Sequence, residues 1–354
     1  MVSHHVGRCI LSREGAMERP THRTNLKSRP VTWSTTAVLA CVALLTIACE
    51  SASASIIFTS DRDGNTEIYA VDPRGEGQAN LTETSDDESA PVVSPNSKLI
   101  AFQSQSRDQS SVEVMRVDGS ARTLVSEGPE IHRSQRWSGD SKRIAYVMER
   151  TSGATIFVAT IEGPEPIPLT AIAADEVGDW SDDGNSVVFA VRSGKDLGLW
   201  VRNPDGVNEV RLTETPDYGP VWSPNSNKIA FLSTRDGNPE IYVMNADGTD
   251  QTRITETDAP EYHVTWSPNG KRLLFISERD GNPEVYVSEA DGKEQTRLTL
   301  NSAKDAQPGW SPNGKKIVFV SYLDGDGEIF VMKADGTAQV RLTNNEAEDT
   351  DPSW

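Results

Sequence analysis

Short apolar runs alternate with polar turns along the chain from Ile56 onward. In one stretch the runs are Val264–Trp266, Leu273–Ile276, Glu284–Val287 and Thr296–Thr299, and the segments between them contain Asn-Gly or Asp-Gly. Runs of this length, rich in β-branched and aromatic residues, are typical of strands, and the Gly-containing pairs favour tight hairpins because they tolerate positive φ. The pattern predicts a four-stranded antiparallel unit, whose strands we call A to D.

The same unit recurs along the chain at intervals of 42 to 44 residues. Its marker is the last residue of strand A, which is Val93, Trp137, Trp180, Trp222, Trp266, Trp310 and Trp354 in turn. So regular a period indicates a repeat architecture, and four-stranded units stacked around an axis bury the faces that one unit leaves exposed. Strand B begins seven times, at Ile56, Leu99, Ile144, Val187, Ile229, Leu273 and Ile317. We therefore predict an all-β fold, a seven-bladed β-propeller.

The order of the strands predicts how the ring closes. The repeat region starts with a strand B at Ile56 and ends with a lone strand A, Asp351–Trp354. This last strand can complete the first blade and pair the edges that an open array would expose. We expect residues 55–354 to form the propeller domain.

The repeat resembles that of TolB, the periplasmic component of the Tol-Pal envelope system. The similarity is carried by Trp222–Asn225, Lys228–Phe231, Arg235–Met244 and Ala246–Thr249, covers all seven units and is strongest in the last ones. It implies a propeller, an exported location and a binding role. TolB differs in having six blades and a separate N-terminal α/β domain, which we expect to be absent because the first blade follows the N-terminal segment within a few residues.

Residues 1–54 have the pattern of an export signal. Basic residues extend to Arg29, an apolar run of twelve covers Ala37–Ala48, and small residues follow at Ser51–Ala54. Twelve residues are too few for the ~20 of a membrane-spanning helix but suit a signal-peptide core. The segment also holds all three cysteines of the chain, Cys9, Cys41 and Cys49.

Two interpretations of this segment stay open. Cleavage after Ala54 would release a periplasmic or secreted protein, whereas lipid modification of Cys49 would give a membrane-anchored lipoprotein. Translation could also start at Met17, which would shorten the long stretch before the apolar run. Since the repeat region has no cysteine, we expect no disulfide in the propeller.

Acidic residues outnumber basic ones, 53 to 34, so the formal net charge is −19. This balance excludes a nucleic-acid binder that works through a basic surface. Part of the excess is periodic: a column of residues stands five positions before each marker, and it consists of Glu88, His132, Asp175, Asp217, Glu261, Asp305 and Asp349.

In propellers the loops from strand D to the next strand A and the B–C loops open onto one face. The B–C loops contain Asp61, Asp63, Asp236, Asp280, Asp324 and Asp326, and the A–B turns at the other face contain Lys98, Lys142, Lys228, Lys271, Lys315 and Lys316. We therefore predict that the acidic column forms a ring at one channel mouth and binds a protein or peptide partner, with basic segments attracted by the field. The alternative is structural, because an Asp before a strand commonly caps a turn.

The B–C loops also have a calcium interpretation. Oxygen-bearing side chains alternate at Asp61, Asp63, Asn65 and Glu67, again at Glu278, Asp280, Asn282 and Glu284, and in part at Asp236, Asn238 and Glu240. Calcium prefers such ligands, but the glycine stands fourth rather than sixth, and no bidentate Glu follows at position twelve. Plain hairpin turns use the same residues, so we expect no metal and no cofactor.

An enzyme is the competing class of function. The repeat region has two histidines, His132 and His263, in different units, and it has no Gly-x-Ser-x-Gly motif, so a His-rich or serine-hydrolase site is not indicated. Carboxylates are abundant, so an enzyme acting on glycans or peptides through channel-mouth carboxylates stays open. We interpret the Trp column as packing between blades rather than as sugar stacking. We expect a non-catalytic, monomeric scaffold in the cell envelope.

Units two to four depart from the consensus. Their B–C loops, Ser106–Gln109, Arg150–Gly153 and Arg192–Lys195, lack Asp-Gly-Asn, and the acidic column is broken at His132. Such units either form a partner-specific sector, with His132, Arg133 and Arg136 as candidates, or reflect drift that the structure tolerates.

Overall fold

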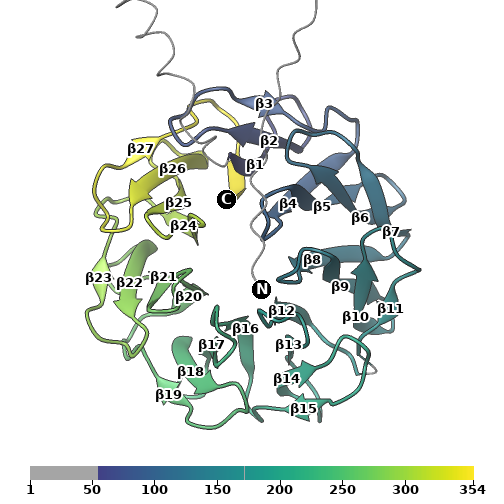
Figure 1. Ribbon diagram of the computed structural model, residues 1–354. Coiled ribbons are helices and arrows are strands. Elements are labelled where there is room, and N and C mark those ends of the chain that lie inside the picture. The colour runs from purple at the N-terminus through teal and green to yellow at the C-terminus, as the bar shows by residue number, and fades with distance from the viewer. Residues whose placement is uncertain (1–54, 171) are drawn as a thin grey trace, which may run out of the picture. The chain divides into compact units, whose positions relative to one another are not determined.

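The described residues of the computed structural model, 55–170 and 172–354, form seven four-stranded antiparallel sheets arranged as the blades of a propeller (Figure 1). This confirms the predicted fold class and the number of blades. The described residues contain no helix. Accordingly, no described segment is a helix that could cross a membrane. The predicted export features, including Met17, Cys49 and Ala54, lie outside the described residues.

The strands of each blade run from the channel outward in the order A, B, C and D. Blade 1 contains β28 (Asp349–Ser353), β1 (Ile56–Ser60), β2 (Glu67–Val71) and β3 (Ala79–Asn80); blade 2, β4 (Asp87–Val93), β5 (Leu99–Gln105), β6 (Ser110–Arg116) and β7 (Thr123–Gly128); blade 3, β8 (Ile131–Trp137), β9 (Arg143–Arg150), β10 (Gly153–Thr160) and β11 (Ile167–Pro168); blade 4, β12 (Glu176–Trp180), β13 (Val187–Val191), β14 (Gly198–Arg202) and β15 (Val210–Arg211). Blade 5 contains β16 (Asp217–Trp222), β17 (Lys228–Ser233), β18 (Glu240–Asn245) and β19 (Thr252–Arg253); blade 6, β20 (Glu261–Trp266), β21 (Arg272–Ser277), β22 (Glu284–Glu289) and β23 (Thr296–Arg297); blade 7, β24 (Asp305–Trp310), β25 (Lys316–Ser321), β26 (Glu328–Lys333) and β27 (Val340–Arg341).

The two ends of the repeat region meet in blade 1. Strand β28 pairs antiparallel with β1, so that Ile57 lies opposite Ser353 and Ser60 lies opposite Asp349. Figure 1 shows the yellow C-terminal strand beside the purple first strand. The predicted closure is therefore confirmed, and it leaves no blade with an unpaired innermost strand.

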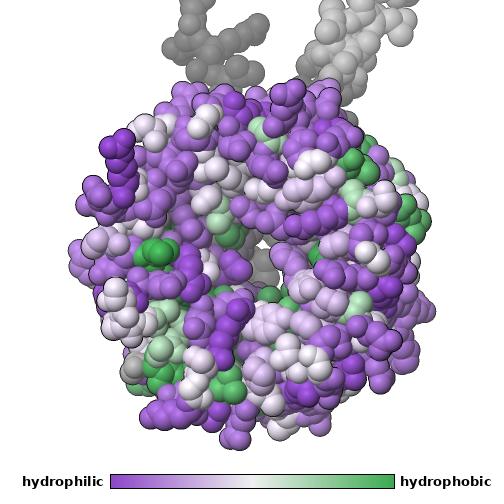
Figure 2. All heavy atoms as spheres, turned by 180° about the vertical axis from the view of Figure 1, so that it is seen from behind, coloured by the Kyte–Doolittle hydropathy of each residue, from purple (hydrophilic) through white to green (hydrophobic). Residues whose placement is uncertain are grey.

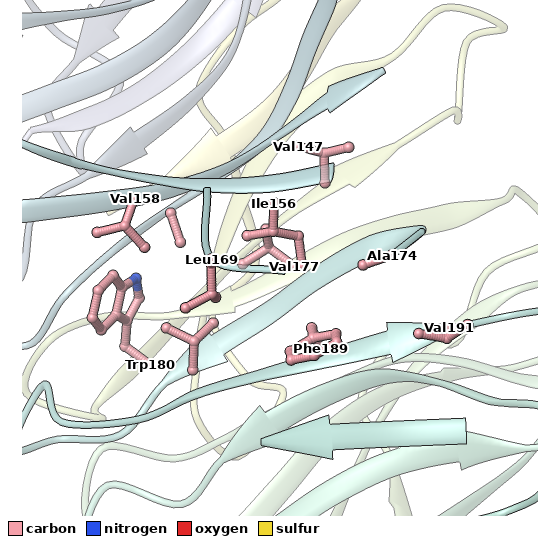
Figure 3. Packing of buried hydrophobic residues seen from close by; sticks show 11 residues of the cluster. Val147, Ile156, Val158, Leu169, Ala174, Val177, Trp180, Phe189 and Val191 are labelled. Atoms are coloured by element: carbon pink, nitrogen blue, oxygen red, sulfur yellow. The ribbon is translucent and has the colours of Figure 1, made fainter. Parts of the chain in front are cut away.

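The hydrophobic core lies between the blades. Each neighbouring pair of blades shares one buried cluster, seven in all among the described residues. Figure 3 shows the cluster between blades 3 and 4, where Ile156 and Leu169 meet Val177 and Phe189. The strand B phenylalanines are among the largest fully buried side chains: Phe58, Phe102, Phe189, Phe231, Phe275 and Phe319.

The Trp column ties neighbouring blades together. Trp137 donates its indole N–H to the carbonyl of Val92 at 2.9 Å, and Trp180 donates to the carbonyl of Arg136 at 3.1 Å. Each bond reaches strand A of the preceding blade, and both rings are buried. The interpretation of this column as inter-blade packing is confirmed.

Candidate functional site

The predicted acidic column begins the innermost strands but does not form an exposed ring. Six of its seven side chains are completely buried, and only Asp175 is partly exposed. Their burial follows from their position, where strand A of each blade starts beneath the B–C loop of the same blade. The expectation of an exposed acidic ring is therefore corrected, while a role of these residues in partner binding stays a prediction.

Most of the buried carboxylates are neutralised by an arginine of their own blade. Arg235 and Asp217 are 2.8 Å apart, Arg279 and Glu261 are 3.0 Å apart, and each arginine comes from the B–C loop. Arg62 and Asp349 make the same pair at 2.8 Å. The guanidinium of Arg235 also lies 4.6 Å from the centre of the Tyr242 ring. The column thus anchors the B–C loops from within.

In blade 2 the buried carboxylate is neutralised by an arginine from a different loop. Its B–C loop has no arginine at the equivalent place, and Arg122, from the C–D loop, lies 2.9 Å from Glu88 instead. Burial raises the pKa of Glu88, and it also raises those of Glu261 and Asp305. All three pKa values are raised because the charged form of a carboxyl group is unfavourable away from water.

His132 is the odd member of the column. It is fully buried, and neither ring nitrogen has a hydrogen-bond partner among the described residues. Burial lowers the pKa of His132, so the ring is held neutral. The predicted partner-specific sector is therefore divided: His132 lies in the interior, whereas Arg136 lines the channel.

Accessible negative charge at the B–C face comes from the loops. Asp61, Asp63, Asp236, Asp280 and Asp324 are exposed, and Asp326 is partly so. The lysines of the A–B turns lie at the other ends of the blades, and all but Lys316, which is partly buried, are exposed. The expected polarity of the disc thus rests on the loop aspartates and not on the column.

The oxygens of the calcium-like loops are occupied within the blades. Asn282 turns its amide nitrogen toward Glu284 at 2.9 Å, and Glu284 accepts further hydrogen bonds from Arg297 and Thr299. Asp280 accepts the hydroxyl hydrogen of Tyr286. The described residues hold no group of three or more His, Cys, Asp or Glu side chains placed to bind a metal ion. Alternation along the sequence does not bring these oxygens to one point.

The central channel provides the largest concave surface that combines several blades. One cavity, of about 540 Å³, is lined by the innermost strands of blades 1, 2, 3, 6 and 7, and a second, of about 500 Å³, by blades 3 to 6. Arg136, His263 and Thr265 line both cavities. In Figure 2 the opposite face of the molecule from Figure 1 is mostly hydrophilic and is hollowed at the centre of the ring.

A bulge in the innermost strands supplies part of the channel lining. In six blades a residue two positions after the acidic column has a positive φ near 50–58°: Ala90, Ser134, Gly219, His263, Gln307 and Asp351. For residues other than glycine this backbone conformation is unfavourable and persists only where the surrounding strands impose it. The residue at this bulge position differs from blade to blade, so the channel is chemically asymmetric.

Polar contacts organise one side of the channel. Gln307 donates its amide N–H to a carboxylate oxygen of Asp351 at 2.6 Å and accepts the Asp351 backbone N–H at 2.9 Å. Burial raises the pKa of Asp351. His263 lies with Nε2 3.2 Å from the carbonyl oxygen of Pro308, to which it donates in the tautomer that carries the proton there.

Charged groups occupy the other side. Asp179 accepts the backbone N–H groups of Trp180 at 2.8 Å and Trp222 at 3.2 Å, and burial raises its pKa to about 6. Removal from bulk water lowers the pKa of His263, and the charge of Arg136 lowers it further. The channel between blades 3 and 6 thus holds the permanent cation of Arg136, the carboxyl group of Asp179 with its raised pKa and the imidazole of His263 with its lowered pKa.

At the mouth over blades 4 to 6, aromatic and charged side chains lie together. Arg192 lies 4.9 Å from the centre of the Tyr218 ring and 3.0 Å from Glu176. Tyr262, of which 37% is exposed, lines the same 500 Å³ cavity. Asp175, the partly exposed member of the acidic column, directly precedes Glu176. We call the group Asp175, Glu176, Arg192, Tyr218 and Tyr262 the blade 4–6 mouth.

A family model described as the TolB beta propeller domain matches residues 107–258 and 215–324, which together span more than half of the chain. The chain belongs to this family. The resemblance inferred from the repeats is confirmed. No curated protein matches the sequence of this TolB-family propeller.

Solved structures show the same fold. TolB from Acinetobacter baumannii is similar with a TM-score of 0.59 and 18% identity, over 84% of this chain and 82% of that one. Oligogalacturonate lyase from Vibrio parahaemolyticus has a TM-score of 0.65 and 16% identity, over 78% and 86%. The β-propeller domain of the Trilobed protease from Pyrococcus furiosus has a TM-score of 0.64 and 15% identity, over 84% and 96%. At these identities the likeness shows the fold of the TolB-family propeller alone, and its neighbours include TolB as well as a lyase and a domain of a protease.

Sequence reasoning missed most of the channel lining. Asp179, Tyr218, Gln307 and Asp351 were not singled out, because none belongs to a constant column of the repeat. They could have been found by looking for positions at which the residue changes from one unit to the next while the flanking residues are repeated.

Proposed function

We propose that this TolB-family propeller is an exported, non-catalytic scaffold that holds a basic peptide segment of a protein partner at the blade 4–6 mouth. The observation that carries the proposal is the 500 Å³ cavity there, which joins two tyrosine rings to the carboxylates of Glu176 and, deeper, Asp179. Rings with a polar edge bind peptide side chains at low entropic cost, and accessible carboxylates select positive charge.

The charge of the surroundings supports a basic segment. Exposed B–C loop aspartates such as Asp236 and Asp280 lie on the same face, and the formal net charge of the chain is −19. Like charges gathered around a mouth concentrate oppositely charged segments near it and accelerate their association. Arg192 and Glu176 largely neutralise each other in their ion pair, so the exposed loop aspartates supply most of this attraction.

Site-specific photocrosslinking in the native cell envelope tests the proposal. A photoreactive phenylalanine analogue replaces Tyr262 in one variant and Leu323, an exposed residue of the blade 7 B–C loop, in the matched control. We expect the position 262 variant to capture a defined protein through a lysine- or arginine-rich peptide, and Tyr218→Ala in the same background to reduce the yield. Equal capture from both positions would count against the mouth as the site.

A second candidate function, an enzyme acting on glycans or peptides, rests on Asp179. A carboxyl group with a pKa near 6 inside a channel has the property of a general acid. A panel of oligosaccharide and peptide substrates, assayed with the wild type and Asp179→Asn, separates the two functions. Turnover that the substitution abolishes would replace the scaffold proposal by the enzyme.

Export is part of the proposal and is tested separately. Mass spectrometry of the mature N-terminus distinguishes a chain that begins at residue 55 from one that begins with a lipid-modified Cys49. A cytoplasmic protein with an intact N-terminal segment would contradict export in either form.

A further inference from the structure

The outermost strand of blade 2 differs from those of the other blades. Strand β7 has six residues, Thr123–Gly128, whereas β3, β11, β15, β19, β23 and β27 have two residues each. It pairs with β6 on its inner side, and on its outer side it pairs with no strand among the described residues. Figure 1 shows β7 running along the rim beside blade 3. In an antiparallel strand alternate residues turn both backbone groups outward, so β7 presents unpaired donors and acceptors.

A threonine side chain stands where the ladder ends in the six short outer strands. In six blades a threonine hydroxyl accepts the N–H of the strand C residue that stands 14 positions earlier: Ile68–Thr82, Ile156–Thr170, Leu199–Thr213, Ile241–Thr255, Val285–Thr299 and Ile329–Thr343. The side chain thereby takes the place of a backbone partner and ends the ladder. In blade 2 the equivalent Val112 lies opposite Ser126 in the ladder itself, and the pairing continues to Gly128.

Blade 2 also lacks the side chain that protects the other edges. In the register of the sheets Leu124 occupies the position held elsewhere by Asn80, Pro168, Arg211, Arg253, Arg297 and Arg341. Charged residues and proline are the usual means of preventing strand addition at an edge. Leu124 is instead apolar, and 52% of it is exposed.

A groove flanks this edge. A cavity of about 170 Å³ lies between Thr123–Val125 and the C–D segment of blade 3, residues 159–166. Its charged lining residues are Glu162 and Glu165, both exposed, and Glu127 is exposed on β7 itself. An added strand would therefore meet apolar surface at Leu124 and negative charge on both sides.

We propose that β7 is a docking edge to which an extended segment of a partner protein, alternating apolar and basic residues, adds as a fifth strand of blade 2. Backbone hydrogen bonds provide the affinity, and Leu124 with the three glutamates selects the side chains. A second copy of this chain is disfavoured as the occupant, because pairing two β7 edges would join two molecules that each carry a net charge of −19. The edge lies apart from the blade 4–6 mouth, so this inference does not depend on the proposed function.

Hydrogen exchange with a defined probe tests the docking edge. The probe is an acetylated and amidated hexapeptide, Lys-Val-Lys-Val-Lys-Val, and its acidic control is Glu-Val-Glu-Val-Glu-Val. We expect the basic peptide to slow exchange of the backbone amides of residues 123–128, and the acidic peptide to leave them unchanged. Protection confined to other segments, such as the channel strands, would overturn the proposal.

Three substitutions at exposed positions refine the test without disturbing the core. Leu124→Lys should weaken binding of the basic peptide about tenfold, because it places like charge in the edge. Val340→Lys, at an outer strand with 46% of the side chain exposed, is the matched control and should have no effect. Tyr262→Ala should leave the protection of residues 123–128 by this peptide unchanged, which separates the edge from the channel mouth. Equal affinity of the wild type and Leu124→Lys would refute the edge as the binding place.

Discussion

At the scale of single residues, the acidic column shows how a repeated charge can be structural. Asp217, Glu261 and Asp349 are each buried against an arginine of the B–C loop, and the arginine side chains remain about one-fifth exposed. Burying a charge is unfavourable unless a partner compensates for it, so each pair holds its loop in one position. Repetition of the residue follows from repetition of this contact.

The Asp217–Arg235 pair gives a stability prediction. Asp217→Asn leaves the guanidinium of Arg235 without its carboxylate, and breaking a buried pair costs on the order of 3 kcal/mol. We expect urea unfolding to show a loss of about that size in the free energy of unfolding. Glu256→Gln, at an exposed carboxylate 3.8 Å from Arg253, is the control and should change stability by less than about 0.5 kcal/mol. Unaltered stability of Asp217→Asn would mean that the column is not structural.

His132 gives a prediction for pH. Burial lowers its pKa in the folded state, so the unfolded chain binds a proton first as the pH falls below 6.5. The contribution of this group is complete above pH 6.5 and is lost below it, with a slope of at most about 1.4 kcal/mol per pH unit.

The variant His132→Leu isolates that slope from other titrating groups. Glu261 and Asp305 have raised pKa values and act in the opposite sense, since their contribution is lost as the pH rises. The free energy of unfolding of the wild type minus that of His132→Leu, measured from pH 7.5 to 5.0, should therefore decrease as the pH falls. Parallel pH profiles would show that His132 does not titrate differently in the folded and unfolded states.

At the scale of elements, the irregular units acquire a structural meaning. The sequence pattern marks units two to four as departures and leaves open whether they form a sector or reflect drift. In blades 2 and 3 the strands other than β11 are six to eight residues long, and the threonine that ends the outer ladder elsewhere is missing in blade 2. Where the other blades have this threonine, blade 2 has Ser126 within the backbone ladder, and its edge strand is longer.

Strand boundaries and repeat columns could be predicted because they depend on local turn chemistry and alternation. The B–C turn of blade 5 is an example: Gly237 has a φ of 122°, which only glycine adopts easily, and the Asp-Gly pair marks the hairpin in the sequence. Burial of Asp217 could not be predicted in the same way, because it depends on Arg235 folding back from the next loop. A single sequence does not indicate which polar residues will pair with each other in the folded protein.

At the scale of the whole molecule, closure joins the two ends of the repeat region. Strand β28 contributes its ladder with β1, the Arg62–Asp349 pair and the contact of Gln307 with Asp351. The ladder and the ion pair complete blade 1, and the contact of Gln307 with Asp351 connects it to blade 7, so the ring has no free end. Asymmetry of function arises at this scale too, since the channel collects one varying residue from each blade.

Deletion of residues 347–354 tests the importance of closure. We expect the truncated protein to have a lower melting temperature, a less cooperative unfolding transition and a tendency to associate through the exposed edge of β1. Scanning calorimetry and size-exclusion chromatography measure these effects. A synthetic peptide of residues 347–354, added in trans, should restore part of the loss. An unchanged melting temperature with a monodisperse truncated chain would contradict the role of β28.

The sequence by itself determined the repeat, the number of blades, the strand order and the closure of the ring, because hydrophobic alternation and turn residues act over a few neighbouring positions and the period multiplies that signal. Tertiary structure alone decided which charges are accessible. It buried the acidic column against arginines, left the loop aspartates exposed, gathered Asp179, His263 and Arg136 in the channel and exposed the edge of β7. These outcomes depend on contacts between residues far apart in the chain, for which a single sequence carries no local pattern.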